Sequence, residues 1–222
     1  MKNKKFKLIL FAFLFTLANA NLYAYSGISP ETTLNLRINS AYSLTFRVGS
    51  YHFLHTPDYG WAHEFDELEV QSFLNYRLNP LVRFAIGYAH EFESDQNSHR
   101  TIQQVSISQR IRSLSLSHRV RSEQTFSSPE PVAFRFRYRA SMEIPLQGET
   151  LDPREFYTTT SAEILYELQE DEREVENRTI LQLGYVINDR NRIQSGFDFR
   201  HFFGTEDEPY RLFFKVAYFI NL

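Results

Sequence analysis

The 222 residues suit one domain, contain no cysteine and carry a formal charge of −3 at pH 7. The lack of cysteine excludes disulfides, zinc–thiolate sites and a lipid anchor on an N-terminal cysteine, and the acidic balance argues against nucleic acid as a partner. Aromatic residues make up 16% of a chain that is polar on average. This combination is typical of strands with one apolar and one polar face.

The first twenty residues have the pattern of a secretory signal peptide. A lysine-rich start precedes an apolar run over residues 8–18, and Ala-Asn-Ala at residues 18–20 is a cleavage pattern. We predict that residues 1–20 are removed during export, with cleavage after Ala24 as the alternative. A signal anchor is disfavoured because the apolar run is short for a bilayer-spanning helix.

Residues 21–41 form an N-terminal segment or an extra strand. Within residues 30–41, Leu34, Leu36 and Ile38 alternate with polar side chains, as in a strand. Three interpretations stay open. The segment extends the first strand around a bulge near Ser40, lies at the periplasmic rim, or belongs to a barrel of twelve strands.

From residue 42 onward, apolar and polar residues alternate in segments longer than ordinary globular strands. In the clearest example, residues 132–144, Phe, Tyr, Met and Ile alternate with Arg, Ser and Glu. Each segment is long enough for a tilted membrane strand, which needs about 9–11 residues. Ten strands are predicted, at residues 42–54, 64–78, 81–93, 98–111, 113–126, 131–145, 155–169, 175–188, 191–203 and 209–222.

The links between these segments alternate in length. Tight turns are predicted at residues 79–80, 112 and 189–190, with a longer link at 146–154 on the same side. The remaining links are mostly longer and acidic, and they are residues 55–63, 94–97, 127–130, 170–174 and 204–208. Outer-membrane barrels have short periplasmic turns and longer external loops. A chain that begins and ends in the periplasm requires an even number of strands, and ten satisfies this.

These patterns predict an all-β fold, a transmembrane antiparallel up-and-down β-barrel of about ten strands over residues 42–222, with twelve possible. No apolar run approaches the length of a membrane helix, and a bilayer otherwise admits only closed barrels. The expected location is the outer membrane of a Gram-negative bacterium. Expected partners are its lipid and lipopolysaccharide, and the barrel-assembly machinery during biogenesis; we expect a monomer. The alternative is a soluble periplasmic lipocalin-like binding barrel, with the apolar side chains inside.

The alternation assigns many charged residues to the lumen. A small barrel is filled by its own side chains, so we expect a salt-bridged network that fixes the barrel's shape. The other interpretation is a narrow passive channel, which a basic excess of the inner face would bias toward anionic solutes. The predicted lumen charges are Arg47, Arg77, Arg83, Arg119, Arg121, Arg135, Arg137, Arg139, Arg178, Arg200, Glu67, Glu69, Glu91, Glu143, Glu163 and Asp198.

The sequence contains no motif typical of an enzyme or a metal centre, and we expect no catalytic residues, cofactor or metal. Ser117 and His118 are adjacent, so on a strand they point to opposite faces and cannot form a nucleophile–base pair. His52, His55 and His63 flank the first external loop. They keep open the alternative of an outer-membrane hydrolase with its site at the extracellular rim.

Several short stretches resemble an uncharacterised family, domain of unknown function 2490. They are Asn75-Tyr76-Arg77-Leu78, Phe134-Arg135-Phe136-Arg137-Tyr138-Arg139, Ala162-Glu163-Ile164, and Asn177-Arg178 followed by Gly184-Tyr185. The resemblance covers most of the mature chain and implies a barrel of the outer membrane with no known activity. The C-terminal strand is also similar to the signal that the barrel-assembly machinery reads, although it ends in Leu222 instead of Phe.

Overall fold

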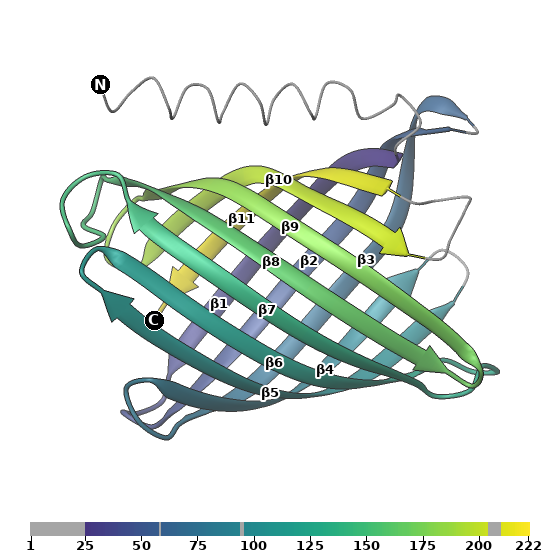
Figure 1. Cartoon of the computed structure of the whole chain (residues 1–222), viewed down its shortest axis with the longest axis horizontal. Helices are drawn as coiled ribbons and strands as arrows, with labels where there is room; N and C mark the ends of the chain where they lie inside the picture. Colours follow the sequence, from purple (N-terminus) through teal and green to yellow (C-terminus); the bar gives the residue numbers. More distant parts are fainter. Residues whose placement is uncertain (1–24, 58, 94–95, 204–209) are drawn as a thin grey trace.

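The fold is a single closed β-barrel (Figure 1). A computed structural model describes residues 25–222 except 58, 94–95 and 204–209. The predicted signal peptide, the whole of the predicted link 204–208 and part of the link 94–97 therefore lie outside the described residues. The described residues form eleven strands and no helix. They are β1 (Tyr25–Arg37), β2 (Tyr42–Thr56), β3 (Gly60–Arg77), β4 (Val82–Glu93), β5 (Asn97–Ile111), β6 (Leu114–Phe126), β7 (Ala133–Pro145), β8 (Phe156–Gln169), β9 (Glu172–Val186), β10 (Asn191–Phe203) and β11 (Tyr210–Asn221).

The barrel closes through one parallel pair of strands. Neighbours in the chain pair antiparallel from β1 to β11, and β1 then pairs parallel with β11, from Tyr25 opposite Arg211 to Asn35 opposite Asn221. The all-β barrel is therefore confirmed, with eleven strands instead of ten and a mixed sheet instead of a wholly antiparallel one. The expectation of an even strand number was wrong, because residues 30–41 supply most of a strand of their own. β1 begins at the end of the barrel opposite the C-terminus (Figure 1).

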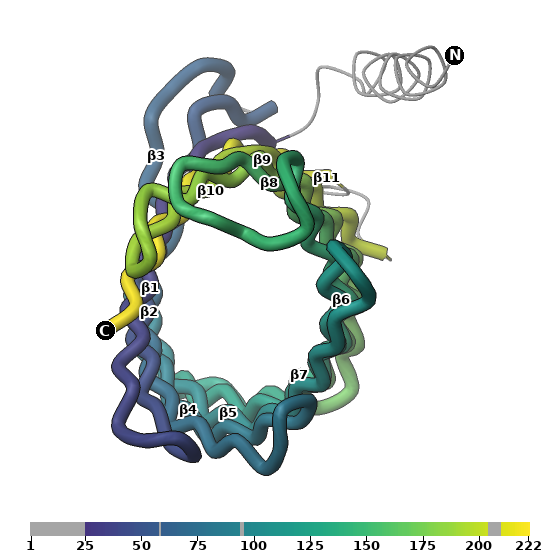
Figure 2. Tube along the Cα trace, turned by 90° about the vertical axis from the view of Figure 1, so that its left-hand side faces the viewer, coloured from purple at the N-terminus to yellow at the C-terminus, as the bar shows by residue number. Residues whose placement is uncertain are grey.

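The two faces of the wall differ in chemistry. Large apolar side chains are exposed on the outside; Val120, Phe136 and Ile86 are 57%, 51% and 63% exposed. On the same strand as Val120, Arg121 and Glu123 are buried inside at 3% and 0%. This is the inverse of a lipocalin-like barrel, so the predicted apolar interior of that alternative is wrong for this chain. Figure 2 shows the closed ring of strands seen close to its axis.

Three of the hairpins at the C-terminal end of the barrel are set by asparagine side chains. Asn79 Oδ1 accepts hydrogen bonds from the backbone N–H groups of Leu81 and Val82, both at 2.8 Å. Asn39 and Asn188 make the equivalent bonds in the β1–β2 and β9–β10 turns. Such side-chain bonds mimic a backbone turn and explain why these links are short.

Two of the links at the opposite end are shorter than the sequence predicted. β2 and β3 continue to Thr56 and from Gly60, which leaves residues 57–59 between them, and β8 and β9 leave only Glu170 and Asp171. Most of the predicted acidic loop 170–174 and of loop 55–63 is thus strand. The β2–β3 hairpin projects beyond its neighbours at this end (Figure 1).

Inner-face glycines accommodate large rings on adjacent strands. Gly184 on β9 lies opposite Tyr157 on β8, and a Cβ built on Gly184 would lie 2.3 Å from the tyrosine ring. Tyr157 is fully buried there and accepts a hydrogen bond from Gln194.

Among the described residues no helix is long and apolar enough to cross a membrane.

Candidate functional site: the charged lumen

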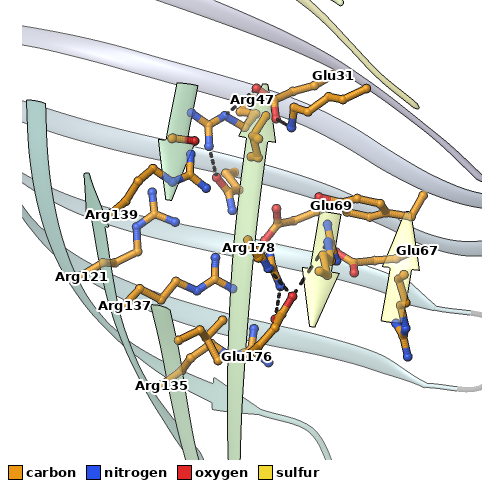
Figure 3. Close-up of a pocket in the computed structure, with 18 of the residues that line it drawn as sticks. Glu31, Arg47, Glu67, Glu69, Arg121, Arg135, Arg137, Arg139, Glu176 and Arg178 are labelled. Atoms are coloured by element: carbon orange, nitrogen blue, oxygen red, sulfur yellow. Dashed lines mark hydrogen bonds and ion pairs between the residues drawn. The ribbon is translucent and has the colours of Figure 1, made fainter. Parts of the chain in front are cut away.

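The lumen contains a cavity of about 440 Å³ whose lining is mostly charged (Figure 3). All eleven strands contribute charged side chains to the cavity or to the wall directly behind it. The basic lining residues are Arg47, Arg100, Arg119, Arg121, Arg135, Arg137, Arg139, Arg178, Arg200, Arg211 and Lys215. The acidic ones are Glu31, Glu67, Glu69, Glu91, Glu93, Glu167, Glu174 and Glu176.

An arginine block occupies the inner face of β6 and β7. Arg119 lies opposite Arg139, and Arg121 lies opposite Arg137. Like charges directly across an antiparallel pair repel, so this arrangement needs counter-charges between them. Two buried carboxylates, on β6 and β8, provide them.

Glu123 is the first of these carboxylates and is 0% exposed. Its oxygens lie 3.2 Å from Arg121 Nη1, 3.4 Å from Arg137 Nε and 3.6 Å from Arg100 Nη1. Glu163, 2% exposed, lies 2.8 Å from Arg139 Nε and 3.2 Å from Arg119 Nη2. A buried carboxylate is costly unless it is paired and hydrogen-bonded. Glu123 Oε1 accepts a hydrogen bond from Arg121, and Glu163 Oε2 accepts hydrogen bonds from Arg119 and Arg139. The other oxygen of each carboxylate is held by charge attraction to guanidinium groups within 4.0 Å.

Arg100 on β5 joins the arginine block to an acidic group on β3 and β4. Its guanidinium pairs with Glu69 at 3.1 Å and also with Glu91 and Glu123. Arg100 is 3% exposed, and Glu91, which also accepts a hydrogen bond from Ser98, is 5% exposed. One cation thus bridges carboxylates from three strands.

The opposite wall carries a second set of pairs. Arg178 on β9 donates to both oxygens of Glu176 at 2.5 and 2.6 Å, and Arg200 on β10 lies 3.3 Å from Asp198. At the parallel seam, Lys215 donates to Glu31 at 2.8 Å. Glu31 also pairs with Arg47 at 3.4 Å, so this cluster ties β11 to β1 and β2.

Aromatic rings line one part of the interior and stack on these cations. The guanidinium carbon of Arg200 lies 4.3 Å from the Tyr51 ring centroid and 5.0 Å from that of Phe213. Arg211 lies 4.8 Å from the Phe202 ring centroid. Desolvated cation–π contacts of this kind stabilise a buried arginine in addition to its ion pairs.

Three carboxylates approach one another closely enough to be considered as a metal group. Ligand oxygens of Glu67, Glu69 and Glu91 lie within 4.8 Å of one another. However, Arg100 already pairs with Glu69 and Glu91 and supplies positive charge at this position. The arrangement is therefore part of the ion-pair network, and acid clusters alone do not define a metal site.

Most of the predicted lumen charges do lie together. Eleven of the sixteen line the cavity, and Glu163 and Asp198 are buried beside it in ion pairs. Three do not join them. Arg77 and Arg83 line a separate recess of about 370 Å³ at the C-terminal end of the barrel, and Glu143 lies 3.9 Å from Arg192.

Four residues central to the network were absent from the predicted set of sixteen: Arg100, Glu123, Glu176 and Glu31. Glu176 lies at the start of the predicted strand 175–188, next to the acidic link 170–174, and it is 2% exposed inside the barrel. The sequence did indicate that Glu176 faces the lumen, because Arg178 was predicted to point inward and residues two apart on a strand share a face. With Glu123, Glu163 and Asp198 behind the lining, the described network holds eleven acidic groups for eleven basic ones. The network itself is therefore balanced in number, whereas its cavity lining alone keeps a basic excess.

The histidines lie outside the lumen. His118 hydrogen-bonds Tyr138 at 2.8 Å, His90 lies 2.9 Å from His99, and His201 stacks on Tyr210. His52 and His63 are hydrogen-bonded to each other on the β2–β3 hairpin.

Comparison with known proteins gives one match. A family model described as a protein of unknown function, DUF2490, matches residues 30–211. No curated protein and no solved structure matches the chain.

Proposed function

The chain belongs to the DUF2490 family of unknown function, and from that premise we propose that it is an outer-membrane β-barrel whose lumen is a structural, ion-paired core. The observation that carries the proposal is the division of the wall into an apolar outside and a charged, paired inside. Hydrocarbon accepts apolar side chains and a hydrogen-bonded closed sheet, and it excludes charged groups.

Features at both ends of the barrel support its proposed position in a membrane. Exposed aromatic residues recur near strand ends, among them Tyr76, Phe92, Phe203 and Tyr210. Aromatic girdles at the two interfaces are typical of outer-membrane barrels. The export signal over residues 1–20, assembly by the barrel-assembly machinery and a monomeric state in lipid and lipopolysaccharide all belong to the proposal.

The structural role follows from the charge balance. Glu123 and Glu163 are each shared by arginines from two or more strands, so their pairs tie adjacent parts of the wall together. Truncating any one partner would leave an uncompensated buried charge, which is costly. The lumen is therefore expected to be rigid.

A narrow passive channel is the second candidate, and the composition of the cavity lining favours it. The lining alone has eleven basic and eight acidic residues, because three acidic partners lie behind it. Small anions would therefore be favoured over cations in any path along the axis.

Conductance of the purified, folded barrel in planar bilayers tests both candidates. The structural core predicts no steps above background in 1 M KCl. The channel predicts small steps whose reversal potential in a KCl gradient shows chloride selectivity. Insertion is checked by heat-modifiable gel migration and by fractionation with the outer membrane. A chain that fractionates with soluble proteins would contradict both candidates.

A further inference from the structure

The outer face of the β2–β3 hairpin carries a hydrogen-bonded row of three polar side chains. Ser50 Oγ lies 3.0 Å from His52 Nε2, and His52 Nδ1 lies 3.2 Å from Nε2 of His63. The two imidazole rings stack with their centroids 5.3 Å apart. Ser50 and His52 are two residues apart on β2 and therefore share a face, unlike the adjacent Ser117 and His118.

This connectivity is that of a nucleophile, a base and an orienting group. If the Nδ1–H of His52 donates to His63, the Nε2 of His52 carries no proton and accepts the hydroxyl hydrogen of Ser50. A serine activated in this way, by a histidine that a third group holds in one tautomer, is a nucleophile. The roles are recognised by geometry and not by a sequence motif.

The backbone at this position is irregular and closely packed. The β2–β3 register shifts between Tyr51 and His52 and again between Phe53 and His55. β-Bulges re-aim side chains and are over-represented next to active sites. On the other side, a Cβ built on Gly27 of β1 would lie 1.9 Å from the carbonyl oxygen of His52, so only glycine permits this approach.

The surroundings of the row indicate the class of substrate. The ring of Phe65 packs edge-on against His52, with centroids 5.6 Å apart. Val48, Val70 and Ile28 continue the apolar outer face and are 46%, 39% and 37% exposed. A polar group placed beside exposed apolar side chains near one end of the barrel suits a molecule with an acyl chain and a polar head.

We propose that Ser50, His52 and His63 form a nucleophilic site that hydrolyses acyl esters of lipids lying against the outer wall of the barrel. The activity goes beyond the structural role of the lumen, and its lipid substrate rests on the proposed membrane position. The alternative of a hydrolase at the extracellular rim thereby gains a defined set of residues. Because the orienting group is an imidazole instead of a carboxylate, turnover is expected to be slow.

The reaction needs only water as a second reactant. Ser50 Oγ attacks the ester carbonyl carbon while its proton passes to His52 Nε2. The C–O bond to the lipid alcohol breaks, and the departing oxygen takes that proton, which leaves an acyl-serine. Water then attacks the acyl carbon and gives a proton to His52. The fatty acid departs as Ser50 recovers its proton.

Covalent labelling tests the nucleophile independently of the membrane. The full mature chain, folded in detergent micelles, is treated with an alkyl fluorophosphonate, and the modified peptide is identified by mass spectrometry. Ser50 should be labelled in the unmodified chain, whereas Ser50→Ala should show no label. Ser72→Ala, on the outer face of β3, should label normally. Absence of label at Ser50 under conditions that label a known serine hydrolase would overturn the proposal.

Ester hydrolysis tests the other two residues and the substrate. We expect His52→Gln and Ser50→Ala to lower fatty-acid release by roughly 10³-fold or more, because triad members act as a unit. His118→Gln, another outer-face histidine, should leave the rate unchanged. His63→Leu should lose activity and His63→Asp should retain it, since a carboxylate also accepts from Nδ1–H; equal loss in both variants would remove His63 from the site.

Three substrates, tested separately, show which kind of acyl ester the site cleaves. Phosphatidylethanolamine vesicles and purified lipopolysaccharide are supplied separately, with a short-chain soluble ester as a third arm. Cleavage of the soluble ester alone would keep the nucleophilic site and contradict the membrane substrate. Equal fatty-acid release by the unmodified chain and Ser50→Ala would overturn the site itself.

Discussion

The two central buried carboxylates of the lumen, Glu123 and Glu163, are each shared among several guanidinium groups. Glu123 contacts arginines from β5, β6 and β7, and Glu163 contacts arginines from β6 and β7. A planar guanidinium has five donors and remains charged, which suits it to bridging carboxylates on different strands. The network therefore depends on a few central anions more than on any single arginine.

Replacing Glu123 should be among the most damaging single changes inside the barrel. Glu123→Gln keeps the volume but leaves Arg100, Arg121 and Arg137 without their shared counter-charge. We expect a loss of about 3–5 kcal/mol in the free energy of unfolding, as when one member of a buried ion pair is removed. Urea unfolding in detergent micelles, followed by far-ultraviolet circular dichroism, measures it.

Glu143→Gln is the matched control for this prediction. Its carboxylate lies 3.9 Å from Arg192, and both side chains are partly exposed, at 29% and 37%. Partly exposed pairs contribute at most about 1 kcal/mol. Equal unfolding midpoints for the two variants would show that the lumen network does not contribute more than a surface pair.

For single residues, the period-two pattern predicted correctly which side chains face the lumen wherever the other face of the strand was consistently apolar. It placed the arginines of β7 correctly because Phe134, Phe136 and Tyr138 mark the opposite face. It missed Arg100 because the apolar residues of β5 change face between Ile102, which is buried inside at 1%, and Val105, which is exposed outside at 37%. The pairing of side chains inside the lumen depends on how the barrel closes. The sequence pattern carries no information on that closure.

Among the elements, β1 decides how the barrel closes. With eleven strands, β1 and β11 run in the same direction, and the seam is parallel over residues 25–35 and 211–221. The pattern identified this strand but did not decide between a bulged extension of the first strand, a segment at the rim and a strand of a twelve-stranded barrel. Its inner face holds Ser29, Glu31 and Thr33, which are polar but mostly uncharged, so it lacks the contrast of β7.

A disulfide across the seam tests this closure, since the natural chain has no cysteine. Thr32 lies opposite Tyr218 in the parallel register. The double variant Thr32→Cys, Tyr218→Cys should cross-link on mild oxidation, because paired positions meet the Cα separation of about 4.4–6.8 Å that a disulfide requires. The measurement is faster migration of the boiled, non-reduced protein on a gel.

An out-of-register pair provides the control for the seam. Thr32→Cys with Phe214→Cys moves the second cysteine four residues along β11, about 13 Å at the usual rise of a strand. This variant should remain uncross-linked. Efficient cross-linking of both variants would indicate a mobile β1, and cross-linking of neither would place β1 outside the barrel wall.

At the scale of the whole molecule, the apolar outer face and the charged inner face of the barrel wall predict where a new charged side chain is tolerated. Val120 lies at the middle of β6 on the outer face, and Ile111 ends β5 on the same face; they are 57% and 54% exposed. In water, arginine at either position would be harmless. In a bilayer the cost depends on depth, at about 2–4 kcal/mol near the midplane and about 0–1 kcal/mol near the interface.

Val120→Arg should therefore destabilise the barrel in lipid vesicles by about 2–4 kcal/mol, and Ile111→Arg by about 1 kcal/mol or less. The free energy of unfolding is measured by urea titration in vesicles of matched thickness, with the unmodified chain alongside. Because the lumen network is the same in all three proteins, a difference between the two positions reports only on what covers the outer face. Equal stabilities would mean that water covers it at mid-strand, and the exposed Phe, Val and Ile side chains would then need a protein partner instead of a membrane.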